Sequence, residues 1–290
     1  MQKKVFIIIV SYNGEQWLFK NLQSLNKSTY PVTTIVVDNY SSDTSKAIVK
    51  LFPEVTLISL NKNLGFGLAN NIAIKEAMAQ DAAYVFLLNQ DTWVFPETIG
   101  NLVAIAETNK EFGIISPLHY SGDGITLDKN FEKYWKGKNQ DLNSELDDIP
   151  FVNAAAWFIP KKVIEKVGLF EPLYTHYGED RNYVSRVLFH NFRVGIVKDS
   201  KICHDRVIKR NFRKDAIQSK YKILTEVLNI NNSLFVGYLR GFMNVLGLPK
   251  YFYKYYSLSS TLHIFIILFW YYVGLLLNLI KIFKTRSSHK

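Results

Sequence analysis

The sequence predicts an α/β fold in which a mixed, mainly parallel sheet is flanked by helices. The first observation is that short apolar runs, rich in strand formers, alternate with segments of helical spacing. Such a βαβα order implies parallel strands joined by right-handed crossovers. The second is that the runs are apolar along their whole length, as strands covered on both faces must be. The third is that a polar segment follows each run, at the sheet edge where ligands bind.

We expect four strands and three intervening helices in the first part of the chain. The N-terminal run has two lysines before it, as a signal peptide would. It is short, however, ends in a turn sequence and has no small-residue cleavage site, so we interpret it as the first strand. The strands are predicted at Val5–Val10, Thr34–Val37, Val55–Leu60 and Tyr84–Leu88. The helices are predicted at Gln16–Leu25, Thr44–Leu51 and Gly67–Gln80, with a further helix near Pro96.

The chain is less regular in its second part. The polar region Leu118–Ile149 is predicted to form a long loop of the kind used as a substrate lid. Regular structure returns with a helix from about Lys161, a helix that opens at Glu179-Asp180, and a strand at Val194–Val197.

Composition narrows the class of protein. Of the 290 residues, 48% are hydrophobic and 14% aromatic, which allows a large core and argues against disorder. The single cysteine, Cys203, excludes an intramolecular disulfide. The net charge of +10 indicates an anionic partner, such as nucleic acid, lipid or substrate. Lys and Arg gather between Lys198 and Lys222 and again after Lys281, around an apolar tail, which favours a membrane surface over nucleic acid.

Polar side chains follow each of the four predicted strands. One such ending is ordinary, because strands need turn residues. Four endings at the same edge of a parallel sheet predict a crevice lined with hydrogen-bonding groups. The segments are Ser11–Gly14, Asp38–Asp43, Asn61–Gly67 and Asn89–Asp91.

Each candidate site residue also has a simpler explanation. Asp38 can accept hydrogen bonds from a base or ribose, or it can cap a turn. The glycines before residue 68 can admit a phosphate at a helix N-terminus, or they can form a tight turn. Asp91 can hold a divalent cation, or it can cap a helix. Asp180 can act as a general base, or it can simply favour the helix dipole. His204 can be a metal ligand or a structural histidine.

Together these residues resemble the family 2 glycosyltransferases with a GT-A fold, in particular the bacterial rhamnosyltransferase-like group. The resemblance covers about the first two thirds of the chain, and the ordered set of short motifs makes it specific. The motifs are Ser11-Tyr12-Asn13, Val37-Asp38-Asn39 with Ser41-Ser42-Asp43, Asn63-Leu64-Gly65-Phe66-Gly67 with Asn70, Leu88-Asn89-Gln90-Asp91, Gly178-Glu179-Asp180 with Arg186, and His204.

The resemblance implies an inverting transfer of a sugar from a nucleotide-diphosphate sugar to a hydroxyl of a glycan. Asp180 would be the catalytic base that removes the proton of the acceptor hydroxyl. Asp91 and His204 would hold Mg²⁺ or Mn²⁺, which offsets charge on the departing diphosphate. The residues expected on the donor side are Ser11, Asp38, Asn63, Gly65, Asn89 and Asp91.

Two positions depart from the family pattern. Asn89 stands where the family often has an aspartate, which lowers the negative charge at the site. Asn182 stands two places after the expected base, where a further acidic residue is common, so metal binding by this helix is not expected.

We therefore expect a GT-A glycosyltransferase catalytic domain at residues 1–210 and a helical, basic and apolar region at residues 211–290. The predicted enzyme elongates a lipid-linked glycan of a cell-surface polysaccharide at the cytoplasmic face of the membrane. One alternative is a catalytically silent glycan- or nucleotide-binding subunit of a membrane synthase complex, which retention of Asp91 and Asp180 disfavours. A sugar nucleotidyltransferase is disfavoured because the loop SYNGEQW lacks the glycine-rich basic sequence of that class.

The C-terminal tail is predicted to contact a membrane. No charged residue occurs from Tyr255 to Ile280, a run long enough to cross a hydrocarbon core. Trp270 lies in its middle and basic residues flank both ends, neither of which suits a single crossing. An in-plane or re-entrant segment is the preferred interpretation. A helix buried against the enzyme or in a homodimer remains the alternative.

Overall fold

The structure, a computed structural model, describes residues 2–135, 144–206 and 210–290. Its contacts divide the chain into two compact units. The first comprises Met1–Thr175 and Asn191–Val207, and it contains the sheet. The second comprises His176–His190 and Ile208–Lys290, and its described elements are helices. The helix that opens at Glu179 therefore belongs with the C-terminal helices.

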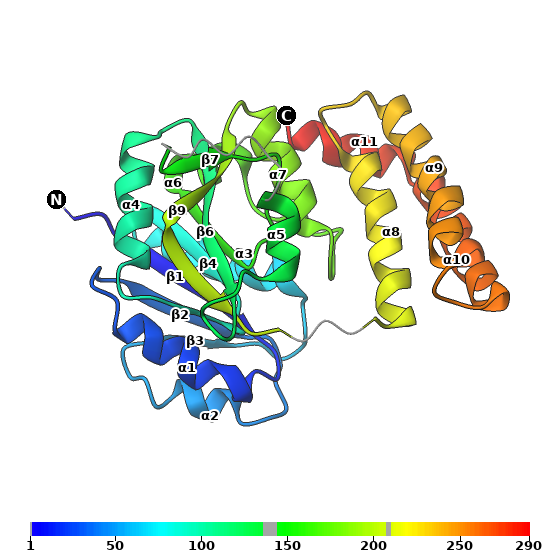
Figure 1. The fold of residues 1–290 in the computed structure, drawn as a ribbon. Coiled ribbons are helices and arrows are strands. Elements are labelled where there is room, and N and C mark those ends of the chain that lie inside the picture. Colours follow the sequence, from blue (N-terminus) through cyan, green and yellow to red (C-terminus); the bar gives the residue numbers. More distant parts are fainter. Residues whose placement is uncertain (1, 136–143, 207–209) are drawn as a thin grey trace. The chain divides into compact units, whose positions relative to one another are not determined.

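The described part of the first unit forms a sheet of nine strands (Figure 1). Their order is β3-β2-β1-β4-β8-β6-β9-β5, with β7 beside β9. Strands β1 to β4 are parallel, β8 is antiparallel to β4 and β6, and both β5 and β7 are antiparallel to β9. The strands are β1 Val5–Ser11, β2 Thr33–Asp38, β3 Thr56–Ser59, β4 Tyr84–Leu88, β5 Thr92–Val94, β6 Phe112–Ser121, β7 Leu146–Asp148, β8 Ala156–Pro160 and β9 Arg193–His204.

All four predicted strands and the three helices between them are confirmed, with ends within two residues of the predicted ones. The helix expected near Pro96 begins at Thr98, and the helix expected from Lys161 begins there. The predicted mixed, mainly parallel sheet flanked by helices is thus the observed fold. The helices of this unit are α1 Glu15–Asn26, α2 Ser45–Val49, α3 Phe66–Ala79, α4 Thr98–Thr108, α5 Lys129–Trp135 and α6 Lys161–Val167.

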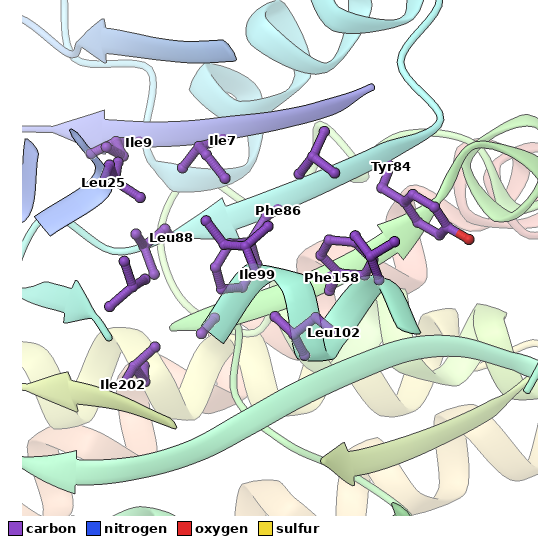
Figure 2. Close-up of a cluster of buried hydrophobic side chains, with 14 of the residues drawn as sticks. Ile7, Ile9, Leu25, Tyr84, Phe86, Leu88, Ile99, Leu102, Phe158 and Ile202 are labelled. Atoms are coloured by element: carbon purple, nitrogen blue, oxygen red, sulfur yellow. The ribbon is translucent and has the colours of Figure 1, made fainter. Parts of the chain in front are cut away.

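The hydrophobic core lies between one face of the sheet and the helices α1 and α4 (Figure 2). Alternate side chains of a strand point to opposite faces, so Ile7 and Ile9 of β1 share this core with Phe86 and Leu88 of β4. Helix α3 packs against β1, β2 and β4. The first strands are thus covered on both sides, as their continuous hydrophobicity requires.

The prediction of a long loop at Leu118–Ile149 is wrong in the described residues. Leu118 to Ser121 continues β6, and α5 and β7 follow, while residues 136–143 lie outside the described chain. The segment was predicted to be a loop because it is polar, but several of its polar side chains make hydrogen bonds that hold α5 and β7 in place. Asp128 accepts hydrogen bonds from the backbone N–H groups of Asn130 and Phe131, which caps α5. Trp135 Nε1 donates to Asp147 Oδ2 over 2.8 Å, which joins α5 to β7.

The second unit is built around α8, which contacts each of the other helices. Within the described residues, one helix is long and apolar enough to cross a membrane, by length and composition only: α10, of which 22% is buried in the protein. The helices are α7 Glu179–Phe189, α8 Phe212–Leu228, α9 Leu234–Phe252, α10 Leu258–Leu277 and α11 Leu279–Ser288.

Candidate active site

The carboxyl ends of β1, β2 and β3 lie level with one another because these parallel strands are paired in register. Ser11 at the end of β1 pairs with Asp38 at the end of β2, and Asp38 pairs with Ser59 at the end of β3. Backbone hydrogen bonds continue this alignment beyond the strands, from Asn39 N to Ser11 O and from Leu60 N to Asp38 O. The predicted polar segments therefore begin side by side.

Ser11 and Asp38 are both buried, and each has an oxygen without a hydrogen-bond partner in the described chain. Asp38 Oδ2 accepts from the backbone N–H of Ser41 over 3.2 Å, which is the turn-capping role that the sequence left open. Its Oδ1 and the Ser11 Oγ are the unpaired atoms. Because buried polar atoms are nearly always paired in folded proteins, these two oxygens are available to accept hydrogen bonds from water or from a polar ligand.

Asn63 and Gly65 shape the loop beside Asp38. The Asn63 Oδ1 accepts from Asn39 Nδ2 over 3.0 Å and from the Gly65 N–H over 2.8 Å. Gly65 has a φ of 80°, and a Cβ at this position would lie 1.6 Å from the Thr175 carbonyl oxygen. The loop therefore needs glycine for its own packing. The close approach of the Thr175 carbonyl supports the tight-turn explanation.

Gln90 joins the end of β4 to the loop after β1. Its Oε1 accepts from the Tyr12 N–H over 2.9 Å, and its Nε2 donates to the Tyr12 carbonyl over 3.3 Å. The contact needs Gly14, because a Cβ there would lie 2.3 Å from Gln90 Oε1. From the other side, Asn21 Nδ2 donates to the carbonyl of Asn89 over 3.0 Å. The turn that presents Asp91 is thus fixed to α1 and to the loop after β1.

Asp91 and His204 approach each other because of a strand pairing. The chain forms β5 directly after Asp91, and β5 pairs antiparallel with β9, with Thr92 opposite His204. Asp91 Oδ1 lies 3.4 Å from His204 Nε2. The His204 side chain is only 1% exposed, whereas that of Asp91 is 19% exposed. The histidine is therefore held by the sheet, and the carboxylate beside it reaches the surface.

This pair suits one divalent cation. Imidazole nitrogen and carboxylate oxygen are both ligands of Mn²⁺. Two adjacent ligands about 2.1 Å from one ion lie about 3 Å apart, close to the observed separation. No group of three or more His, Cys, Asp or Glu side chains able to hold a metal occurs among the described residues. A cation bound here would take its remaining ligands from water and from a phosphorylated ligand.

Asp180 belongs to the second unit, whereas the residues of the sheet edge belong to the first. It lies in the first turn of α7, next to Glu179. Burial raises the pKa of Asp180. Burial and the charge of Asp180 raise the pKa of Glu179 to about 7. A raised carboxyl pKa makes the carboxylate a stronger base. Both side chains of this turn therefore have the chemistry of a general base.

The sequence analysis missed the residues that support His204. Arg206 forms a two-bond ion pair with Asp128, with Nε 3.0 Å from Oδ2 and Nη2 2.6 Å from Oδ1. His119 is fully buried, stacks on Phe131 and meets His204 edge to face, with ring centroids 6.0 Å apart. Of these contacts, the one with His119 packs directly against the His204 ring. No sequence motif marks them, because the partners come from β6, α5 and the end of β9.

The model of a family described as Glycosyl transferase family 2 matches residues 6–168. The matched range contains Ser11, Asp38, Asn63 and Asp91 and ends before Asp180 and His204.

The relatives and solved structures that are similar to the chain include the following three. It is 26% identical over 221 residues to the dTDP-rhamnosyl transferase RfbF of Shigella flexneri, covering 70% of each protein. It is 33% identical over 128 residues to the N-acetylglucosaminyl-diphospho-decaprenol L-rhamnosyltransferase of Mycobacterium tuberculosis, covering 41% of this chain and 42% of the relative. The fold is similar to that of the mannosyltransferase PcManGT from Pyrobaculum calidifontis, solved with GDP-Man and Mn²⁺. That likeness has a TM-score of 0.59 at 13% identity and covers 90% of this chain and 78% of the other. It confirms the predicted GT-A fold.

Proposed function

The chain belongs to glycosyl transferase family 2, and we propose that it transfers a sugar from a nucleotide-diphosphate sugar to a glycan hydroxyl, with inversion at the anomeric carbon. The observation that carries the proposal is the position of Asp91 beside His204, at the edge of the sheet where Ser11 and Asp38 hold unpaired buried oxygens. Rhamnose is the first donor sugar to test, because both relatives are named as rhamnosyltransferases.

In this proposal the unpaired oxygens of Ser11 and Asp38 accept hydrogen bonds from the nucleoside of the donor. Gln90 keeps the loop after β1 in place for this contact through its two hydrogen bonds to Tyr12. Asp91 and His204 would hold a divalent cation, which supplies positive charge beside the diphosphate when it is bound. The Mn²⁺ in the structure of PcManGT supports the choice of metal.

Asp180 is the proposed base. Its carboxylate takes the proton of the acceptor hydroxyl while the acceptor oxygen forms a bond to the anomeric carbon. The bond from that carbon to the diphosphate oxygen breaks on the opposite face, and the nucleotide diphosphate leaves with the bonding electrons. The raised pKa of Asp180 supports this role, because a more basic carboxylate accepts a proton more readily.

The acceptor we propose is a lipid-linked glycan at the cytoplasmic face of a membrane, with residues 1–210 as the catalytic domain and the helical tail as the membrane-associated part. The name of the mycobacterial relative, which contains a diphospho-decaprenol, supports a lipid-linked acceptor. The apolar helix α10 supports membrane contact.

The proposal is tested with purified full-length protein, Mn²⁺ and a panel that contains dTDP-rhamnose, UDP-GlcNAc and GDP-mannose. Release of nucleoside diphosphate with one of the donors, dependent on acceptor, is the expected result. Binding of a nucleotide sugar without turnover on any acceptor would instead indicate a silent binding subunit.

A further inference from the structure

The second unit exposes two apolar stripes on neighbouring helices. On α9 the stripe repeats every three to four residues, as one face of a helix does. Its members are Phe235, Leu239, Phe242, Met243 and Leu246, which are 41–76% exposed. On α10 and just beyond it the stripe contains Leu262, Ile266, Phe269, Trp270, Leu276, Leu277 and Ile280. Exposed apolar side chains in such number mark an interaction site.

The two stripes form one surface, which we call the α9–α10 face. Gly237 of α9 faces α8, and Gly241 lies against both α8 and Tyr272 of α10. Phe242, about a quarter turn further round, rests against Tyr272 of α10. The exposed stripe of α9 therefore lies on the side of this helix that faces away from α8. On α10, Tyr271 faces Lys220 of α8 and Tyr272 faces α9. The exposed row that contains Phe269 lies on the side of α10 that faces away from α8. Figure 1 shows α9 and α10 side by side.

Helix α10 is attached to α8 and α9 at both of its ends. Before its start, the Tyr256 hydroxyl donates to Asp215 Oδ2 of α8 over 2.7 Å. Near its end, the Tyr238 hydroxyl of α9 donates to the Leu275 carbonyl over 2.8 Å. Beyond it, Arg286 of α11 donates to the Val227 carbonyl at the end of α8 over 2.7 Å. The helix therefore runs along the length of α8.

This attachment argues against a crossing of the membrane by α10. Helix α8 carries charged side chains along its whole length, and charged groups are costly in the hydrocarbon core. If α10 crossed the bilayer, α8 would have to enter it as well. The charged residues of α8 are Arg213, Lys214, Asp215, Lys220, Lys222 and Glu226.

The charge around the α9–α10 face fits an anionic bilayer. Residues 227–290 contain seven Lys and Arg residues and no Asp or Glu. Exposed lysines stand at both ends of the helix pair, Lys250 and Lys254 at one end and Lys281 and Lys284 at the other. In a helix pair that lies in the plane of the membrane, all four reach the same layer of lipid headgroups. Trp270, in the middle of α10, would then also lie at the interface, where tryptophan is favoured.

We propose that the α9–α10 face docks in the plane of an anionic lipid bilayer, as a one-sided anchor that places both chain ends on the side of the catalytic unit. This deepens the membrane association proposed above and names the surface and its orientation. The inference adds α9, whose stripe the sequence analysis did not recognise. It can fail while the glycosyltransferase proposal stands, because vesicle binding is measured without any nucleotide sugar.

The docking surface is tested by flotation of the full chain with vesicles of phosphatidylcholine alone or with phosphatidylglycerol. We expect the protein to float with the anionic vesicles and to remain bound to them at high salt. The double variant Met243→Ser/Leu246→Ser should lower partitioning about tenfold or more, since it removes two apolar side chains from the face. The control Leu51→Ser changes an equally exposed leucine of the first unit and should float as the unchanged protein does. A stable dimer in solution that the double variant dissociates, without vesicle binding, would overturn the proposal in favour of a second copy.

The orientation is tested with single cysteines and a membrane-impermeant maleimide in inverted membrane vesicles. The native Cys203 is buried, so it serves as the background. Lys50→Cys reports on the first unit and Ser287→Cys on the chain end, and both positions are exposed. Labelling of both from the same side is expected. Labelling of Lys50→Cys alone, with Ser287→Cys reached only after detergent, would show that α10 crosses the membrane.

Discussion

Asp91 Oδ1 lies 3.4 Å from His204 Nε2, because β5 and β9 pair with Thr92 opposite His204. This contact joins the end of the fourth strand to a residue near the end of the first unit. The strand Tyr84–Leu88 ends in a polar segment whose carboxylate lies beside this histidine, and the proposed function assigns a divalent cation to the pair.

Asp91→Asn and His204→Ala are each expected to weaken Mn²⁺-dependent donor binding by about tenfold or more, because even the loss of a residue that only supports a metal ligand costs about 10–100-fold. Titration calorimetry with the nucleotide sugar, with and without Mn²⁺, measures this. Asp81→Asn is the matched control, because its side chain is 82% exposed and pairs only at the surface with Lys161. If Mn²⁺ strengthens donor binding equally in all three variants, Asp91 and His204 do not hold the metal.

Asp180→Asn is expected to lower kcat by about 10²–10⁴-fold and to leave donor affinity unchanged, because it removes a general base without changing the shape of the side chain. The pKa of Asp180 is raised by burial, so activity should fall as pH drops through this raised pKa and the base becomes protonated. Steady-state rates against pH check both points. Normal turnover of Asp180→Asn beside an inactive Glu179→Gln would assign the base to Glu179.

Glu179 should make stability depend on pH. Its pKa is about 7 in the folded protein, above the ordinary value of 4.5, so the folded state holds more protons between these limits. Stability should therefore fall as pH rises from about 4.5 to about 7 through this group. Glu179→Gln should unfold at a higher temperature than the unchanged protein at pH 8, with the difference lost at low pH. Equal melting temperatures of the two proteins at pH 8 would contradict the raised pKa of Glu179.

Gly14→Ala is expected to destabilise the fold by about 1 kcal/mol, through loss of the hydrogen bonds between Gln90 and Tyr12. The added Cβ would lie 2.3 Å from Gln90 Oε1, so Gln90 must release Tyr12, and donor affinity should fall with it. Gly100→Ala is the matched control, because nothing lies within 4 Å of a Cβ there. It should gain up to about 1 kcal/mol as a helical alanine. Denaturant unfolding compares the two.

Arg286→Met is expected to destabilise the second unit by about 1–3 kcal/mol, because it leaves buried backbone carbonyls at the end of α8 without a donor. Lys284→Met, an exposed change in the same helix, should have little effect on thermal unfolding. A similar melting temperature for both variants would show that α11 does not hold the unit together.

Local patterns were enough to predict the first strands and helices, because continuous apolar runs and helical spacing are properties of neighbouring residues. The three-residue strand β5 has no such pattern, and its pairing with β9 joins segments far apart in the chain. Asp91 and His204 were therefore linked in the sequence by resemblance alone. The same limit hid the ion pair of Asp128 with Arg206. The apolar stripe of α9 is a local pattern, but its exposure depends on how α9 packs against α8 and α10.

Metal-dependent sugar transfer with inversion can be followed in a single reaction. Purified full-length protein is incubated with dTDP-rhamnose, or the donor selected from the panel, and an acceptor, and the product is followed by NMR with Mn²⁺, with excess EDTA, and after Mn²⁺ is restored. We expect a glycoside of inverted anomeric configuration, which forms with Mn²⁺, does not form in excess EDTA and forms again when Mn²⁺ is restored. Full activity in excess EDTA, or a product that retains the donor configuration, would contradict it.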